Sequence, residues 1–454
     1  MKKQYFGTDG IRGRVGDGFI NPEFALKLGW AAGEFLRRNN KNKEISVVIA
    51  KDTRLSGYLF EFSIASGLTA AGVNVYLLGP MPTPAVAYFT RTFDANLGIV
   101  ISASHNSFED NGIKFFCADG MKLSDSNELE LSEIIDEKLV CADPKNIGKI
   151  KRIEDARGRY IEFCKSAVPS LMSFSGVKIV LDCANGATYK IAPRVFKERG
   201  ADIIVINNKP DGININKNCG SCFIKNLQHK VLEEKADLGI AFDGDGDRVI
   251  MVDHLGHEVN GDQILYLLAM DRFDRGILGD GVVGTVMTNM AIESSLSKKG
   301  IALERSKVGD RYVMEMLKKR QWHLGGESSG HIISLSQTTT GDGIIAAMQV
   351  LAYLIRCNKK LSDLLVDAKL YPQKMINISF AGFESLVKSD KFWSAVTNIV
   401  SDAESESGLK DKGRVLVRAS GTEPVIRVMV EAKSLDLVES YLDKLVNAIK
   451  KLFV

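Results

Sequence analysis

Short, almost continuous apolar runs alternate with amphipathic stretches along the first three quarters of this chain. An apolar run at 45–50 leads into the polar turn 51–54, a helical stretch and a second run at 72–78. A third run, Leu97–Ile101, ends in another polar loop. Such runs are typical of strands buried on both faces, and their alternation with helices predicts α/β layers with mainly parallel strand order.

The same order of elements recurs twice, so the chain contains an internal repeat. In the second copy the run Leu238–Phe242 delivers a loop rich in carboxylates, and a weaker third copy ends in the loop 325–331. Each copy places a polar loop at the carboxyl end of a strand, where open α/β sheets bind their ligands. We therefore predict three similar α/β domains with mainly parallel mixed sheets around a central cleft.

The last part of the chain has a different pattern and predicts a smaller C-terminal α+β domain. Its expected elements are strands at 375–380, 413–418 and 425–430, helices near 388–401 and 435–452, and a polar loop at 402–412. The predicted domains cover residues 1–160 (nucleophile loop), 161–257 (carboxylate loop), 258–369 (third copy) and 370–454 (C-terminal).

Composition narrows the function classes. The chain has 454 residues, and 59 Lys and Arg against 56 Asp and Glu leave a net charge of +3. This balance gives no reason to expect nucleic acid or an acidic membrane as a partner. No segment approaches the ~20 apolar residues that a membrane span needs. Seven scattered cysteines without a signal-like N-terminus indicate a reduced, cytoplasmic protein.

Three short loops carry complementary chemistry. The first, 102–106 (SASHN), offers the Ser104 hydroxyl as a phosphoryl carrier. The second, 243–248 (DGDGDR), places Asp243, Asp245 and Asp247 at alternate positions, a pattern that suits a hard divalent cation. The third, 418–424 (RASGTEP), combines cations, hydroxyls and glycine, which suits a phosphate group. A nucleophile, a metal and a phosphate clamp together predict phosphoryl transfer.

Each loop also has a plainer interpretation. The serine loop could cap the following helix, the carboxylates could form a solvated acidic turn, and the third loop could be a simple turn. An EF-hand is excluded because its sixth and twelfth positions would be Arg248 and His254 rather than Gly and Glu. A serine hydrolase is disfavoured because the Gly-x-Ser-x-Gly elbow is missing.

Taken together, these motifs resemble those of the bacterial phosphoglucosamine mutases, within the α-D-phosphohexomutase superfamily. The resemblance spans essentially the whole chain, and two of its features, VGDRYV (308–313) and the SGTEP form of the phosphate loop, are typical of the glucosamine branch. Ser107 stands where the family usually has Pro, and Phe223 where it has His. The matching motifs are FGTDGIRG (6–13), ISASHN (101–106), DNGIKFF (110–116), FDGDGDR (242–248), GGESSGH (325–331) and RASGTEPVIRVMVE (418–431).

The resemblance implies an isomerase that interconverts glucosamine 6-phosphate and glucosamine 1-phosphate, feeding UDP-N-acetylglucosamine and cell-wall precursor synthesis. Ser104 would be a phosphoserine, Mg²⁺ would bind it together with the three aspartates, and glucosamine 1,6-bisphosphate would be the intermediate. The remaining implied site residues are Arg12, Lys114, Arg248 and His331 near the phosphoserine, with Lys114 or His331 as general acid/base, Glu327 and Ser329 at the sugar, and Arg418, Ser420, Gly421, Thr422 and Arg427 at the distant phosphate.

Two other function classes stay open from the sequence. One is the same chemistry on a different hexose phosphate, and the other is a phosphosugar sensor without catalysis. The implied partner is a small phosphosugar, and a homodimer is compatible with the resemblance.

Overall fold

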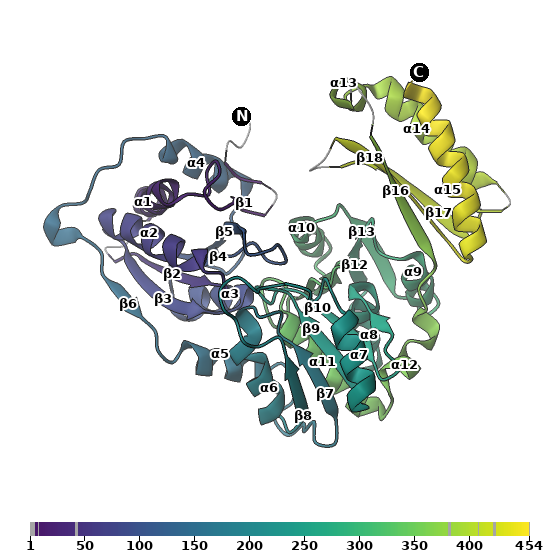
Figure 1. Cartoon of the computed structure of the whole chain (residues 1–454), viewed down its shortest axis with the longest axis horizontal. Helices are drawn as coiled ribbons and strands as arrows, with labels where there is room; N and C mark the ends of the chain where they lie inside the picture. Colours follow the sequence, from purple (N-terminus) through teal and green to yellow (C-terminus); the bar gives the residue numbers. More distant parts are fainter. Residues whose placement is uncertain are drawn as a thin grey trace. The chain divides into compact units, whose positions relative to one another are not determined.

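The computed structural model describes residues 5–7, 9–40, 44–379, 383–406, 408–420 and 424–453. The chain forms two compact units, Met1–Met287 with Ile301–Val366, and Thr288–Gly300 with Asp367–Val454. Three sheets lie in the larger unit and one sheet lies in the smaller unit (Figure 1).

The first sheet has six strands in the order β1-β5-β4-β2-β3-β6. Strands β2, β3, β4 and β6 are parallel, whereas β5 runs antiparallel to both β4 and β1. Helices α1, α2 and α4 share one hydrophobic core with the sheet, and α3 packs against β2, β4 and β5 outside that core. The elements are β1 (Ile11–Arg14), α1 (Pro22–Asn39), β2 (Ser46–Lys51), α2 (Ser56–Ala70), β3 (Asn74–Pro80), α3 (Thr83–Thr92), β4 (Leu97–Ile101), β5 (Asp110–Cys117), α4 (Asp125–Ile135) and β6 (Ile150–Arg152).

Local sequence explains where these helices begin. The Asn21 side chain caps α1 by accepting the Phe24 N–H at 2.8 Å, and Pro22 fills the first helical position, which needs no donor. Ser124 caps α4 in the same way. Asp125 and Glu128 then lie in the first turn of α4, where negative charge is favoured by the helix dipole.

The second sheet has five strands in the order β11-β10-β9-β7-β8. Strands β7, β8 and β9 are parallel, while β10 returns antiparallel to β9. Helix α7 covers one face through a small apolar core. The elements are α5 (Ala156–Lys165), β7 (Lys178–Asp182), α6 (Ala192–Glu198), β8 (Asp202–Ile206), α7 (Lys225–Glu234), β9 (Leu238–Phe242), β10 (Val249–Asp253) and β11 (Glu258–Val259).

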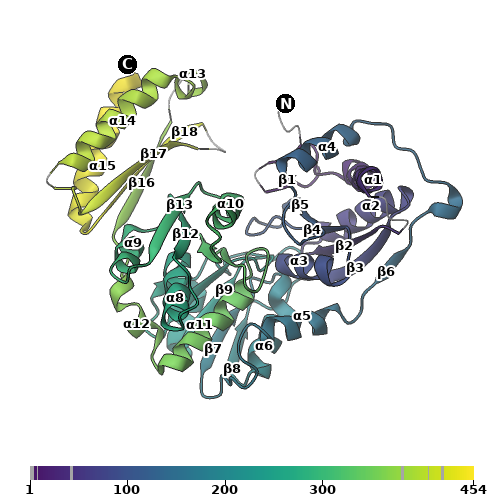
Figure 2. The same cartoon turned by 180° about the vertical axis from the view of Figure 1, so that it is seen from behind.

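The third sheet has four strands in the order β13-β12-β14-β15, and only β15 runs antiparallel to its neighbour. Its paired strands β12 and β13 are labelled side by side in Figure 2. Helix α10 packs on β12 and β14, and α11 contacts both this sheet and the second one. The elements are α8 (Gly261–Asp274), β12 (Gly281–Thr285), β13 (Ala302–Ser306), α10 (Asp310–Arg320), β14 (Leu324–Gly326), β15 (Ile332–Ser334), α11 (Gly343–Cys357) and α12 (Leu361–Leu364).

The smaller unit is an antiparallel sheet of three strands, β16-β18-β17, packed against α14 and α15. It also includes α9, because the buried carboxylate of Glu431 accepts the Met290 N–H at the start of that helix and pairs with Arg414 at 3.0 Å. The elements are α9 (Met290–Ser297), β16 (Gln373–Ser379), α13 (Phe383–Val387), α14 (Asp390–Ser405), β17 (Gly413–Ala419), β18 (Val425–Ala432) and α15 (Leu435–Lys450).

The predicted fold class, three α/β layers followed by a smaller α+β domain, is confirmed. The strands Leu97–Ile101 and Leu238–Phe242 lie where the apolar runs predicted them. The predicted loop at 402–412 is wrong at its start, because α14 continues to Ser405 and buries Ala403. The exact residues at which the four predicted domains begin and end stay predictions. Within the described ranges, no helix combines the length and apolarity that crossing a membrane requires.

Candidate active site

Ser104 is buried in the loop that joins β4 to β5. Its backbone is left-handed, with φ of 51°, a conformation that is rare outside glycine and clusters at functional sites. Its N–H donates to the Ser102 hydroxyl at 2.8 Å, and its own hydroxyl donates to Asp243 Oδ2 at 2.6 Å. The loop therefore directs the predicted nucleophile at the first carboxylate of the DGDGDR loop.

Two residues that sequence reasoning did not assign hold this loop in place. The buried guanidinium of Arg54 donates to the carbonyl oxygens of Asn106 at 2.6 Å and of Ser104 at 3.3 Å. The side-chain amide of Asn216 donates to the same two carbonyls, each at 2.9 Å. The available signal was the polar turn 51–54 at the end of a predicted strand, where a charged residue is placed to face a ligand site.

We expect Arg54→Lys to lower turnover by roughly 10–100-fold, because a lysine keeps the charge but has one nitrogen, whereas the Arg54 guanidinium uses three to bond Asp52, the Ser104 and Asn106 carbonyls, and the Ser107 carbonyl. Small misplacements of reacting groups are costly. Turnover and thermal melting should be measured beside the exposed control Arg159→Lys. Wild-type turnover of a folded Arg54→Lys protein would show that the loop does not depend on this fork.

Ser107 occupies the position that is usually Pro in the resembling family. Its hydroxyl donates to Glu109 Oε2 at 2.5 Å, and its carbonyl accepts the Asp110 N–H at 3.3 Å and an Arg54 N–H at 3.4 Å. Hydrogen bonds therefore constrain the loop at the point where a pyrrolidine ring would otherwise restrict the backbone.

The carboxylate loop connects β9 to β10, and Asp243, Asp245 and Asp247 are all buried in it. One oxygen from each lies within 4.8 Å of the other two. Gly246 makes the turn possible, because its φ is 72° and a Cβ there would lie 2.6 Å from Thr188 Cγ2. The turn thus converts alternate positions in sequence into three convergent carboxylates.

The three carboxylates have unequal environments. Burial, followed by repulsion from Asp245 and Asp247, raises the pKa of Asp243 well above its ordinary value. Burial also acts to raise the pKa of Asp247, but Lys114 and His331 outweigh it and hold that pKa well below its ordinary value. The cluster therefore concentrates negative charge that its own cations only partly balance.

This donor set fits a divalent metal ion. Asp245 Oδ1 and Asp247 Oδ1 are buried and accept no hydrogen bond from any residue that the structure describes. Buried acceptors are normally satisfied, so two such oxygens on adjacent carboxylates point to a missing cation. Hard oxygen ligands suit Mg²⁺ or a similar ion. The three aspartates thus form a site for a metal cofactor.

Lys114, Arg12 and Arg248 surround the carboxylates. Lys114 Nζ lies 3.0 Å from Asp245 Oδ2 and 3.4 Å from Asp247 Oδ2. Burial would lower the pKa of Lys114, but these carboxylates and Asp9 outweigh it and raise that pKa above its ordinary value. Arg12 pairs with Asp9, and the backbone N–H of Arg248 donates to Asp243 Oδ1 at 3.3 Å.

His331 is buried beside Asp247. Its Nδ1 lies 3.7 Å from Asp247 Oδ2, and its Nε2 lies 3.4 Å from Asp310 Oδ2. Burial would lower the pKa of His331, but the two carboxylates raise it above its ordinary value. Sequence reasoning named His331 but gave no role to Asp310, which the VGDRYV motif contains.

A cavity of about 650 Å³ opens beside these groups, which is the usual size of a small-ligand site. Glu327 and Ser329, the predicted sugar ligands, lie on its wall, and Glu327 Oε1 accepts the Gly309 N–H at 2.9 Å. The larger unit therefore brings together the predicted residues Ser104, Asp243, Asp245, Asp247, Arg12, Lys114, Arg248, His331, Glu327 and Ser329.

The predicted phosphate loop lies in the smaller unit. Arg418 and Arg427 are directly opposite each other on β17 and β18, and the Ser420 N–H donates to the Val425 carbonyl at 2.9 Å. Burial and the charge of Arg427 lower the pKa of Arg418, a repulsion that a bound anion would relieve. Gly421 and Thr422 lie outside the described residues.

Models of the domains of one known family match most of the chain. The models for phosphoglucomutase/phosphomannomutase alpha/beta/alpha domains I, II and III match residues 3–139, 158–256 and 260–371. The model for the C-terminal domain matches residues 382–448. The fold is shared with a phosphoglucomutase/phosphomannomutase family protein of Burkholderia thailandensis, which is 24% identical with a TM-score of 0.82 over 99% of this chain and 98% of that one.

A second solved structure with this fold is the N-acetylphosphoglucosamine mutase of Aspergillus fumigatus in complex with GlcNAc-6P and magnesium. It is 16% identical, with a TM-score of 0.69 over 100% of this chain and 97% of that one. Among curated relatives, the phosphoglucosamine mutases of Photorhabdus laumondii and Alcanivorax borkumensis are 54% and 52% identical, each over 99% of both chains. With such identity over its whole length, this chain belongs to the phosphoglucosamine mutases of the phosphoglucomutase/phosphomannomutase family.

Proposed function

We propose that this protein interconverts glucosamine 6-phosphate and glucosamine 1-phosphate, with Ser104 as the phosphoryl carrier and glucosamine 1,6-bisphosphate as the intermediate. The observation that carries the proposal is the 2.6 Å contact between the Ser104 hydroxyl and Asp243, within a buried carboxylate cluster that suits a metal. The 52–54% identical relatives that bear the name phosphoglucosamine mutase support the choice of sugar.

Mg²⁺ is the ion that we assign to Asp243, Asp245 and Asp247, together with an oxygen of phosphorylated Ser104. When bound, it would neutralise the charge that a phosphoserine and three carboxylates place together, and would act as a Lewis acid on the phosphoryl oxygens. Arg12 and Arg248, on the cavity wall, supply further positive charge toward the phosphoryl group.

The transfer requires one proton movement in each half-reaction. In the first, a sugar hydroxyl forms a new P–O bond while the bond to Ser104 Oγ breaks, so the sugar hydroxyl loses a proton and the serine gains one. In the second, the Ser104 hydroxyl forms the new P–O bond while the bond to the other sugar oxygen breaks, so the proton moves in the opposite direction. Lys114 and His331 are the two candidate groups. The carboxylates around Lys114 keep it protonated and make its proton harder to release, whereas His331 lies between two carboxylates that can hold it in a fixed orientation.

The intermediate must present each of its phosphates to Ser104 in turn. We assign the phosphate that does not react to Arg418, Ser420, Gly421, Thr422 and Arg427, and the sugar hydroxyls to Glu327 and Ser329. A clamp of two arginines and backbone donors grips a phosphate in either sugar orientation, because it makes no use of the ring itself.

We expect Arg418→Ala and Arg427→Ala each to weaken substrate capture by roughly 10–100-fold, because a charged hydrogen bond contributes ~1.5–3 kcal/mol and ~1.4 kcal/mol is tenfold. The variants should also release more bisphosphate during turnover. Affinity, bisphosphate release and loss of phosphoserine should be measured against Lys444→Ala on the exposed face of α15. Unchanged values of all three quantities would show that the loop is a simple turn and does not bind the phosphate.

The function is tested by assaying phosphorylated enzyme with the 6-phosphates of glucosamine, mannose and glucose side by side. We expect the highest kcat/KM with the amino sugar. A higher value for another hexose would keep the chemistry and change the substrate, whereas no turnover of any of them would favour the sensor.

Seven free thiols agree with a cytoplasmic location, and a homodimer stays a prediction.

A further inference from the structure

The turn 308–311 at the start of α10 is fixed to the catalytic site on two sides. Gly309, with φ of 124°, donates its N–H to the proposed sugar ligand Glu327 at 2.9 Å. The next residue, Asp310, lies 3.4 Å from His331 Nε2 and pairs with Lys122, which also pairs with Asp9. The position of this turn therefore affects both the sugar ligand and a proposed proton-transfer group.

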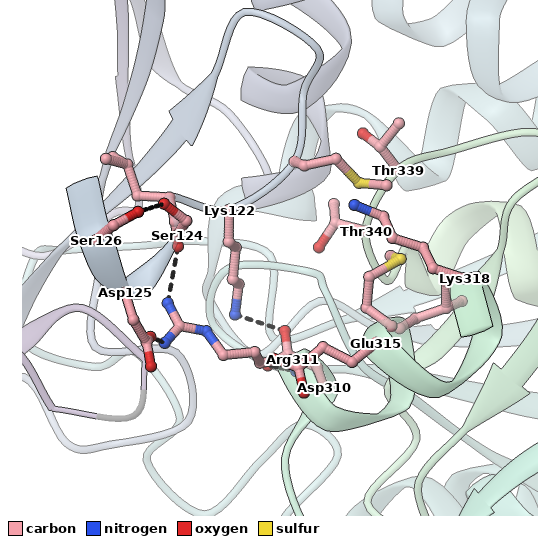
Figure 3. Close-up of a pocket in the computed structure, with 14 residues that line it drawn as sticks. Lys122, Ser124, Asp125, Ser126, Asp310, Arg311, Glu315, Lys318, Thr339 and Thr340 are labelled. Atoms are coloured by element: carbon pink, nitrogen blue, oxygen red, sulfur yellow. Dashed lines mark hydrogen bonds and ion pairs between the residues drawn. The ribbon is translucent and has the colours of Figure 1, made fainter. Parts of the chain in front are cut away.

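Arg311 fixes the same turn on a third side, by reaching to the first sheet's domain. Its guanidinium donates to Glu128 Oε1 at 2.9 Å and to the Leu123 carbonyl at 2.8 Å, and it also pairs with Asp125. Figure 3 shows the Arg311 side chain extending from α10 toward Asp125, with Lys122 and Asp310 beside it. The three acceptors lie at the start of α4 and just before it.

The Arg311–Glu128 pair is largely shielded from water. The side chain of Glu128 is 6% exposed and that of Arg311 is 18% exposed. A planar guanidinium that bonds two carboxylates and a carbonyl has little freedom to rotate, so it fixes orientation as well as distance. Removing Arg311 takes a charged partner at 2.9 Å from the poorly hydrated Glu128 carboxylate, which makes the pair consequential.

Several hydrogen bonds and ion pairs join the two domains beside a cavity. A cavity of about 460 Å³ lies between residues 121–126 and α10, with Met121, Met314, Lys318 and Thr340 on its wall. Besides the pairs of Lys122 and Arg311, the Thr339 hydroxyl donates to the Gly120 carbonyl at 2.6 Å. These directional contacts therefore join the two domains at the edge of the cavity.

We propose that Arg311 is a positioning residue for the mutase reaction. By fixing the turn 308–311 to α4, it sets where Glu327, Asp310 and His331 lie relative to Ser104. This inference rests on the proposed function, and it adds to that function a residue that lines the catalytic cavity and acts through the turn 308–311. The physical reason is that the nucleophile and the sugar ligands come from different sheets, so their spacing depends on the contacts between those sheets.

The test compares Arg311→Ala, Arg311→Lys, Glu128→Gln and the double variant Arg311→Ala/Glu128→Gln in the full-length phosphorylated enzyme. We expect Arg311→Ala to lower kcat/KM for glucosamine 6-phosphate by roughly 10–100-fold and to increase bisphosphate release, since misplacement by about 1 Å has effects of that size. Arg311→Lys should recover part of the loss. Arg320→Ala, at the exposed end of the same helix, is the matched control and should match the wild type.

The double variant separates a shared role from two independent ones. If Arg311 acts through Glu128, the double variant is no worse than Arg311→Ala alone, whereas independent roles would multiply the two losses. A purely structural pair would lower the melting temperature and the folded fraction, but would leave KM and bisphosphate release of the folded enzyme unchanged. Either multiplied losses or unchanged KM and release would overturn the proposal.

The proposed function and this inference fail in different ways. A wild-type enzyme without activity on glucosamine 6-phosphate would contradict the proposed function. An active wild-type enzyme together with an Arg311→Ala variant of unchanged kcat/KM and bisphosphate release would contradict this inference alone. If Arg311→Ala does not fold, the near-isosteric Glu128→Gln variant and Arg311→Lys provide the same readouts, and normal kcat/KM in both would overturn the assignment.

Discussion

Ser104→Ala is expected to abolish mutase turnover, with a loss on the order of 10⁴–10⁶-fold, the range seen when a catalytic nucleophile or its base is removed. No other hydroxyl contacts Asp243 among the described residues, so a neighbouring serine cannot easily replace it. The fold should persist, because the side chain is small and the φ of 51° is equally unfavourable for serine and alanine. The measurements are steady-state turnover, thermal melting and intact mass after incubation with bisphosphate.

The best control for Ser104→Ala lies in the same loop. Ser107 is exposed and its hydroxyl bonds only the Glu109 side chain in the described structure, so Ser107→Ala should retain turnover. Ser102→Ala is a poorer control, because the buried Ser102 hydroxyl accepts the Ser104 N–H and donates to Asp52 at 2.6 Å. If the Ser104→Ala enzyme is active and still gains one phosphoryl group, another residue must be the nucleophile.

The sequence predicted the parts of this site that depend on short-range pattern. Apolar runs located β4 and β9, and the loops that follow these strands carry Ser104 and Asp243 at the carboxyl ends, where α/β sheets bind their ligands. Alternate aspartates separated by glycines indicated a metal site before any geometry was available. These signals are local, so one sequence is enough to detect them.

Contacts between distant segments could not be predicted in this way. Arg54 and Asn216 clamp the Ser104 loop from positions 50 and 112 residues away, and neither belongs to a motif with a chemical signature of its own. Arg311 binds Glu128 across 183 residues, and although the VGDRYV motif contains Arg311, no sequence pattern points to Glu128 as its partner. Their roles depend on how sheets meet, and hydrophobic periodicity contains no information about that.

Asp243→Asn is expected to remove most metal binding and turnover while leaving the metal-free protein at least as stable as the wild type. The two effects have opposite signs for one reason. Burial and the repulsion from Asp245 and Asp247 raise the pKa of Asp243, so its charge is unfavourable in the folded protein until a cation is bound. Asparagine has nearly the same shape, and its oxygen can still accept the Ser104 hydroxyl.

The loss of Mg²⁺ affinity should exceed the roughly 10–100-fold that loss of an outer-shell partner typically causes, because a direct anionic ligand becomes neutral. Titration calorimetry and melting curves, each with and without Mg²⁺, measure both halves of the prediction. Asp202→Asn, on the exposed start of β8, is the control and should behave as wild type. Since Mg²⁺ stabilises only a protein that binds it, the metal-dependent rise in melting temperature should disappear in Asp243→Asn and persist in Asp202→Asn. Full activity of wild-type enzyme after treatment with a chelator would contradict the metal assignment, and a strongly destabilised metal-free Asp243→Asn would contradict the account of charge repulsion.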